Sequence, residues 1–150
     1  MNENKPKWYQ ILLIGFFWIL SGGLGLIILA LGREVILVIG VNSFNLNRWV
    51  IPFVNNAYYF IAGLIWLGMF YFAEAYFSQG FKKKILFQRI LRFLGIEVLV
   101  IAAMQIVLMI YRFFPLTTLG LMITLAEIVL GISMLVVPHY FHVRLAGTQS

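Results

Sequence analysis

The sequence has 150 residues, of which 63% are hydrophobic and only 11% are charged, and its mean hydropathy is +0.98. A soluble domain is roughly half apolar and a quarter charged, so this composition indicates an integral membrane protein. The net charge is +6, but the basic residues stand at the ends of apolar runs, where they favour anionic lipid headgroups over nucleic acid as the partner. The chain has no cysteine, which excludes disulfides, thiol redox chemistry and cysteine-ligated metals.

The first apolar run covers residues 11–31, close to the roughly 20 residues that cross the hydrocarbon of a bilayer. A cleaved signal peptide is the alternative, because lysines precede the run and small residues occur near its middle. The run extends beyond the usual length of a signal-peptide core, which favours a membrane span. Gly32, Arg33 and Glu34 are expected to close this span at the interface.

Residues 35–57 form the least regular segment. Its apolar part is too short to cross a membrane, and its five asparagines favour turns. We expect an extension of the first helix and then an interfacial loop, with Trp49 and Pro52 at the boundary. A re-entrant loop is the alternative, and it would need protein or water to cover its unpaired backbone groups.

Three further apolar runs predict spans at about residues 58–77, 90–111 and 117–137. Gly80 is placed to stop the second helix, and Pro138 to end the fourth. No hydrophilic segment is long enough for a separate soluble domain, so residues 1–150 are expected to form one transmembrane domain.

Two pairs of small residues recur four positions apart within the predicted spans. Ser21 and Gly25 lie in the first span, and Gly120 and Thr124 lie in the fourth. Such spacing places both residues of a pair on one helix face, where a second helix can approach closely. The alternative is that glycine is simply tolerated in membrane helices.

The turn between the second and third spans carries the densest positive charge. Its basic residues are Lys82, Lys83, Lys84, Arg89 and Arg92. Within residues 81–93 the polar and the apolar residues would fall on opposite faces of a helix. This pattern predicts an amphipathic helix lying at the interface. This surface is expected to contact anionic lipid or a partner, or else to be an ordinary basic flank that fixes orientation.

Basic residues divide unequally between the two sides of the predicted spans. One side has Lys5, Lys7, Lys82, Lys83, Lys84, Arg89, Arg92 and Arg144, and the other has Arg33, Arg48 and Arg112. The richer side is expected to be cytoplasmic. The predicted fold is therefore an all-α integral membrane protein, a four-transmembrane-helix bundle of two hairpins with both termini in the cytoplasm, in the cell membrane.

Three carboxylic acids and one amide interrupt the predicted spans. Glu127 and Gln105 fall near the bilayer centre, and Glu97 and Glu74 lie about 6 and 9 Å towards the cytoplasm. An isolated charge at this depth costs about 2.5 to 3.5 kcal/mol, so the acids are expected to face inward or a partner. Three roles stay open: a proton or cation relay, docking to a basic residue of another subunit, or protonated acids bonded within the chain.

No catalytic motif accompanies these acids, and no enzyme activity is predicted. His139 and His142 lie beyond the last span with no acid or cysteine nearby in the sequence, which makes them a poor metal site. Haem between the helices would need axial ligands within a span, so no haem is expected. No cofactor and no metal are expected.

Three features carry a resemblance to a known family: LGREV at residues 31–35, YFSQGF at residues 76–81, and the basic re-entry into the third span. With the length and span order, they make the chain similar to the phosphate-starvation-inducible PsiE-like family of small four-span bacterial membrane proteins. The resemblance implies an inner-membrane, stress-associated protein and carries over no catalytic residue. An arginine inside the third span of that family has no counterpart near Gln105.

From these features we predict a non-enzymatic protein that acts by association, as a homo-oligomer or as an accessory subunit of a larger membrane complex. The alternative is a component of a proton- or cation-coupled transporter or channel that uses Glu74, Glu97 and Glu127.

Overall fold

The computed structural model describes residues 8–44, 47, 49–82, 85–111 and 117–146. These residues form four α-helices and their turns, with no strand among them. The helices are α1 (Trp8–Phe44), α2 (Ile51–Lys82), α3 (Leu86–Ile110) and α4 (Thr118–Ala146). Each contains a stretch that is long and apolar enough to cross a membrane, as the sequence predicts for a multi-pass membrane protein. The four-helix, all-α fold class is confirmed.

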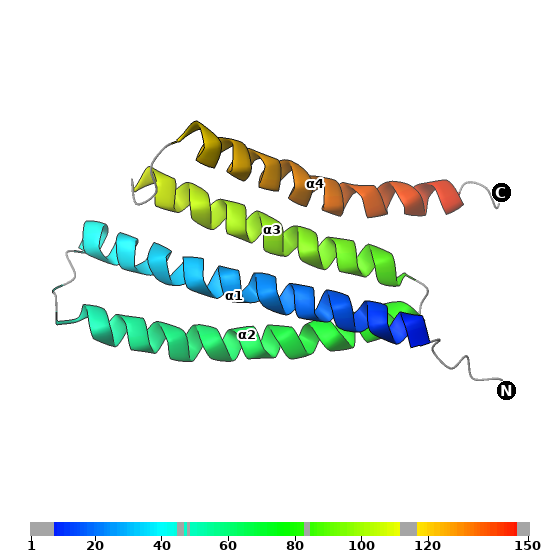
Figure 1. Ribbon diagram of the computed structural model, residues 1–150, viewed down its shortest axis with the longest axis horizontal. Helices are drawn as coiled ribbons and strands as arrows, with labels where there is room; N and C mark the ends of the chain where they lie inside the picture. Colours follow the sequence, from blue (N-terminus) through cyan, green and yellow to red (C-terminus); the bar gives the residue numbers. More distant parts are fainter. Residues whose placement is uncertain (1–7, 45–46, 48, 83–84, 112–116, 147–150) are drawn as a thin grey trace.

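The helices lie alongside one another with α1 between α2 and α3 and with α4 on the outer side of α3 (Figure 1). Helix α1 packs against α2 and α3, and α2 also meets α3. Within the described residues α4 packs against α3 and has no packing contact with α1 or α2. The arrangement is therefore an open one, in which α4 leaves one flank of the molecule uncovered.

The first two helices are much longer than the predicted spans. Helix α1 has 37 residues, about 55 Å at 1.5 Å per residue, against roughly 30 Å of hydrocarbon. It runs through Arg33 and Glu34 without a break, so the predicted end of the first span is not the end of a helix. The helix extension beyond residue 35 is present, but the expected loop shrinks to the residues between Phe44 and Ile51.

Two predicted helix boundaries were wrong. Pro138 does not end the last helix, because α4 continues through it to Ala146; a membrane helix tolerates an internal proline when neighbours compensate for the missing N–H group. Residues 81–93 also do not form one helix, because Lys82 is the end of α2 and residues 86–93 are the start of the continuous helix α3. Lys83 and Lys84 lie outside the described residues.

A small apolar core joins α2 and α3 next to their connection. It consists of Ala73, Phe77, Ile90 and Leu94, all buried. Phe77 also makes an edge-to-face contact with Phe93, with ring centroids 5.6 Å apart. The turn above this core is tight because the Gly80 carbonyl accepts a hydrogen bond from the Ile85 amide at 3.0 Å. We call the end of the molecule that carries this turn the basic end; α1 begins and α4 ends there too (Figure 1).

Glycines let α1 and α2 approach closely, and aromatic rings of α2 fill the space. A Cβ added at Gly22 would lie 2.5 Å from the Phe70 ring, and one added at Gly25 would lie 2.5 Å from Trp66. At Gly32, nearer the other end, the added atom would lie 2.5 Å from the Tyr58 hydroxyl. Helix association in lipid depends on close packing. The aromatic rings of α2 provide it here by lying directly against the glycine backbone of α1.

Helices α3 and α4 meet through a different pair of glycines. A Cβ added at Gly95 would lie 3.0 Å from the Gly131 carbonyl oxygen, and one added at Gly131 would lie 3.2 Å from the Gly95 carbonyl oxygen. The two backbones therefore touch directly at this crossing. Small residues at the crossing of two membrane helices permit this approach.

Candidate functional site: two polar places along the first helix

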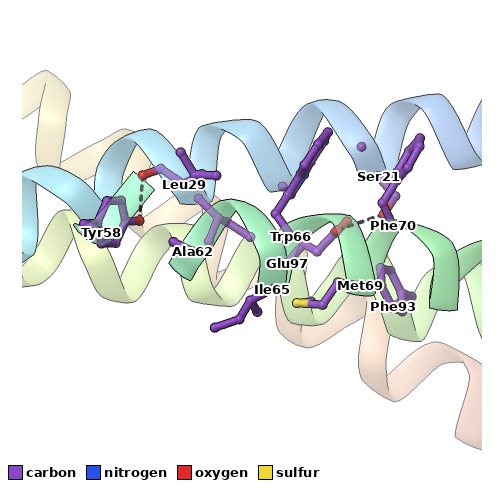
Figure 2. Close-up of a pocket in the computed structure, with 13 residues that line it drawn as sticks. Ser21, Leu29, Tyr58, Ala62, Ile65, Trp66, Met69, Phe70, Phe93 and Glu97 are labelled. Atoms are coloured by element: carbon purple, nitrogen blue, oxygen red, sulfur yellow. Dashed lines mark hydrogen bonds between the residues drawn. The ribbon is translucent and has the colours of Figure 1, made fainter. Parts of the chain in front are cut away.

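The acid predicted at Glu97 is held inside the molecule. Its side chain is 4% exposed, and its Oε1 atom accepts a hydrogen bond of 2.8 Å from the Ser21 hydroxyl of α1 (Figure 2). The other carboxyl oxygen, Oε2, is buried and has no hydrogen-bond partner in the part of the chain that the structure describes. Ser21, which the sequence assigned to helix packing, is thus the polar partner of an intramembrane acid on α3.

A cavity of about 140 Å³ lies beside this hydrogen bond, between α1, α2 and α3. Its walls include Gly25, Trp66 and Phe70, and it reaches from Ser21 and Glu97 towards Tyr58 (Figure 2). The Tyr58 hydroxyl donates a hydrogen bond of 2.7 Å to the Leu29 carbonyl. One end of the cavity therefore has the Glu97 carboxyl oxygen that lacks a donor. At the other end the Tyr58 hydroxyl already donates to a carbonyl.

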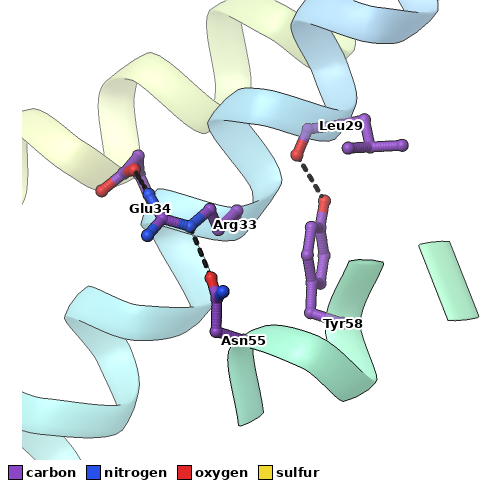
Figure 3. Close-up of polar contacts among 5 residues, drawn as sticks. All are labelled: Leu29, Arg33, Glu34, Asn55 and Tyr58. Atoms are coloured by element: carbon purple, nitrogen blue, oxygen red, sulfur yellow. Dashed lines mark hydrogen bonds and ion pairs between the residues drawn. The ribbon is translucent and has the colours of Figure 1, made fainter. Parts of the chain in front are cut away.

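The second polar place is the charged pair of Arg33 and Glu34, two neighbouring residues of α1 whose side chains form an ion pair. Arg33 Nε also donates a 2.6 Å hydrogen bond to the Asn55 side-chain oxygen on α2 (Figure 3). The two charged side chains remain 33% and 28% exposed. The charged pair is therefore only partly covered by this chain.

The depth of the charged pair follows from its neighbours. Gly32, next to Arg33, lies against Tyr58 of α2. A Cβ added at Gly32 would also lie 3.4 Å from the Met104 methyl group of α3. Met104 stands seven residues inside the predicted third span, about 10 Å from its end. The predicted ends of the first and third spans are thus offset, and Arg33 sits level with the interior of α3.

Exposed apolar side chains continue on both sides of the charged pair. On α1 they include Ile27 before it and Ile36 and Val41 after it. The neighbouring helices continue the apolar surface at that end with Phe53, Ile110 and Leu119. Apolar surface facing outwards on a membrane protein is the surface that meets lipid or another subunit. The charged pair therefore interrupts an apolar surface and does not mark its edge.

The acids predicted to share one slab do not come together. Glu74 is exposed on α2, whereas Glu127 on α4 is partly buried and accepts a 3.3 Å hydrogen bond from the Gln105 amide of α3. The Gln105 oxygen accepts a 2.8 Å bond from the Thr124 hydroxyl, which also lies 3.0 Å from the Gly120 carbonyl. Glu127 and Gln105 thus link α3 to α4, while Glu97 links α3 to α1.

The basic residues at the turn have two different environments. Arg89 donates a 2.9 Å hydrogen bond to the Tyr76 carbonyl, and its guanidinium carbon lies 4.5 Å from the centre of the Tyr76 ring. Arg92 is exposed and can extend along the surface towards headgroups. Arg89 therefore fastens α3 to α2, and Arg92 is the described basic residue available to lipid.

The sequence did not single out Arg33, Glu34, Asn55 or Tyr58 as intramembrane polar residues. The available signal was the apolar run of residues 35–41, which resumes after the charged pair without a glycine or proline between them. Among the described residues no group of three potential ligands from His, Cys, Asp and Glu could hold a metal ion.

Comparison with known protein families, with curated proteins and with solved structures finds no match for this chain. The resemblance to the PsiE-like family therefore stays a prediction, and the function has to be argued from the two polar places and their surroundings.

Proposed function

We propose that this protein is a non-enzymatic membrane subunit that acts by association, either with copies of itself or with a larger membrane complex. The observation that carries the proposal is the charged pair, which lies within the apolar surface of α1 and is about one-third exposed. An ionised side chain facing lipid at membrane depth is expensive, and such residues face a protein interior, a partner or water. A partner helix over this part of α1 would cover both side chains.

The open packing of the helices supports the same proposal. In a closed four-helix bundle each helix has two neighbours, whereas α4 packs against α3 alone within the described residues. Within the described residues no fourth helix covers the side of α1 that faces away from α2 and α3, and the charged pair stays partly accessible. Ala30, one turn before Arg33, is exposed as well, and a small residue there allows a second helix to come close.

Native mass measurement of the protein purified in a mild detergent tests the proposal. We expect a homo-oligomer or a complex with a second protein, and the mass tells these two forms of association apart. A strictly monomeric species with no co-purifying protein would contradict the proposal.

We propose the cytoplasm for the basic end and both termini, in the cell membrane. The support is the unequal division of basic residues and the position of the turn at the same end as the start of α1 and the end of α4 (Figure 1). Reporter fusions after Gly80 and after Ser150 should both give a cytoplasmic signal. An external signal from the Gly80 fusion would reverse the orientation.

Ion transport has weaker support. Glu97 bonds to Ser21, Glu127 bonds to Gln105 and Glu74 is exposed. None of the hydrogen bonds found among the described residues joins one acid to another. The observation in its favour is that Glu97 and Glu127 each keep a buried carboxyl oxygen without a partner. Replacing Glu127 tests it, as set out in the Discussion.

A further inference from the structure

The cavity beside Glu97 has the size of a site for a small ligand. Its volume of about 140 Å³ is close to that of an engineered protein cavity of about 150 Å³ that binds benzene. Most of its wall is apolar, including the rings of Trp66, Phe70 and Phe93. A ligand that fills it would therefore be mainly apolar and about as large as one aromatic ring with a short chain.

Glu97 supplies the polar feature of this cavity. The side chain is 96% buried, as its 4% exposure shows, and it lines the cavity. Ser21 satisfies Oε1, but no group among the described residues donates to Oε2. A buried carboxyl oxygen without a donor is costly, and a ligand that donates a hydrogen bond to it would recover part of that cost.

The charges around the cavity favour a cation. Among the described residues that line the cavity, Glu97 is the one acid, and none is Lys, Arg or His. Aromatic faces attract cations, most strongly when water is excluded. At the far end the Tyr58 hydroxyl is already donating to Leu29, which leaves that end suited to an apolar group.

We propose that this cavity binds a small lipophilic amine, whose ammonium group donates to Glu97 Oε2 while its apolar part lies between α1 and α2 towards Tyr58. The ligand would enter from the membrane phase, where such amines accumulate. The proposal does not depend on association of the subunit, because all the lining residues belong to one chain.

Fluorine NMR of the purified protein in detergent micelles tests the proposal with a matched pair of probes. Para-fluorophenethylamine carries the ammonium group, and para-fluoroethylbenzene has a similar ring and chain without it. We expect saturable binding of the amine at neutral pH, about tenfold or more tighter than binding of the neutral probe, because a hydrogen bond to a charged group is worth about 1.5 to 3 kcal/mol. Equal affinity of the two probes for the wild-type protein would overturn the proposal without any variant.

Two variants locate the site. Glu97→Gln should reduce the amine affinity by about tenfold or more and leave the neutral probe unaffected, and Ala62→Leu should block both probes by filling the cavity that Ala62 lines. Glu74→Gln and Ala103→Leu are the matched controls, because both residues are exposed and line no part of this cavity. Unchanged amine binding in Ala62→Leu or in a folded Glu97→Gln protein would place the amine elsewhere and overturn the assignment.

Discussion

Helix α1 carries two polar places that the chain treats in opposite ways. Ser21 is buried and bonded to Glu97 of α3, so this place is closed by the chain's own helices. The charged pair, twelve residues further along α1, keeps about a third of its side-chain surface exposed. The difference shows where the structure is complete: the polar place in the basic half of α1 is closed by the chain's own helices, and the one that contains Arg33 still lacks a cover.

Glu34→Gln should have the largest effect on association. The change removes the negative charge beside Arg33 and leaves only neutral oxygens, those of Asn55 and of the new glutamine, as its acceptors. Breaking a buried ion pair costs about 3 to 5 kcal/mol. We expect the oligomer or complex to dissociate in native mass measurements, while the thermal stability of the monomer changes by less than about 0.5 kcal/mol. Glu127→Gln, which alters an acid bonded to Gln105 within the chain, is the control. An undiminished complex would show that the charged pair is not covered by the partner.

Gly22→Ala tests the closed half of α1. The new methyl group would lie 2.5 Å from the Phe70 ring, and that ring cannot easily move because it stacks on Trp18 with centroids 4.1 Å apart. Overpacking of this kind costs about 1 to 3 kcal/mol, measurable by unfolding in a denaturing detergent. Gly23→Ala is the matched control, since nothing lies within 4 Å of its added Cβ. Equal stability of the two variants would contradict the glycine–aromatic packing.

Ser21→Ala should have a smaller effect on stability. The change leaves both oxygens of the buried Glu97 without a donor, and hydrogen bonds between membrane helices are worth about 0.6 to 1.7 kcal/mol. Ser133→Ala is the comparison, because that hydroxyl is exposed and bonds to the Val129 carbonyl of its own helix. If both changes cost the same in an unfolding titration, the Ser21–Glu97 bond does not hold α1 to α3.

Glu127→Gln should have no effect on ion movement. A glutamine keeps the shape and the acceptor oxygen that bonds to Gln105 but removes the ionisable proton. We expect proteoliposomes of the wild-type and variant proteins to show the same background flux of protons and cations. A wild-type flux that disappears in the variant would favour the transport alternative.

The number and order of the helices could be predicted because four apolar runs of spanning length are visible in the composition of the chain alone. The ends of the helices could not. The sequence around Arg33 and Glu34 does not tell whether the pair ends a helix or lies inside one. Only the position of Met104 beside Gly32 shows how far along the bundle the pair lies. Pro138 likewise ends many helices, but here α4 continues through it.

The partners of the acids were equally hidden in the sequence. Depth along a helix follows from residue number, but the direction in which a side chain points depends on how the helices rotate against one another. The sequence therefore identified Glu97 and Ser21 as separate residues of interest, 76 positions apart, and could not show that they bond. For the same reason it could not show that Glu74 faces outwards.

Photo-crosslinking from single cysteines tests most directly whether a partner covers the charged pair. Because the chain has no cysteine of its own, benzophenone-maleimide can be attached at Ala30→Cys beside the pair, or at the exposed alanines of two other helices, Ala75→Cys on α2 and Ala126→Cys on α4. We predict a protein–protein adduct in native membranes from position 30 and little or none from positions 75 and 126. No adduct from position 30, or equal adducts from all three, would contradict a partner at Arg33 and Glu34.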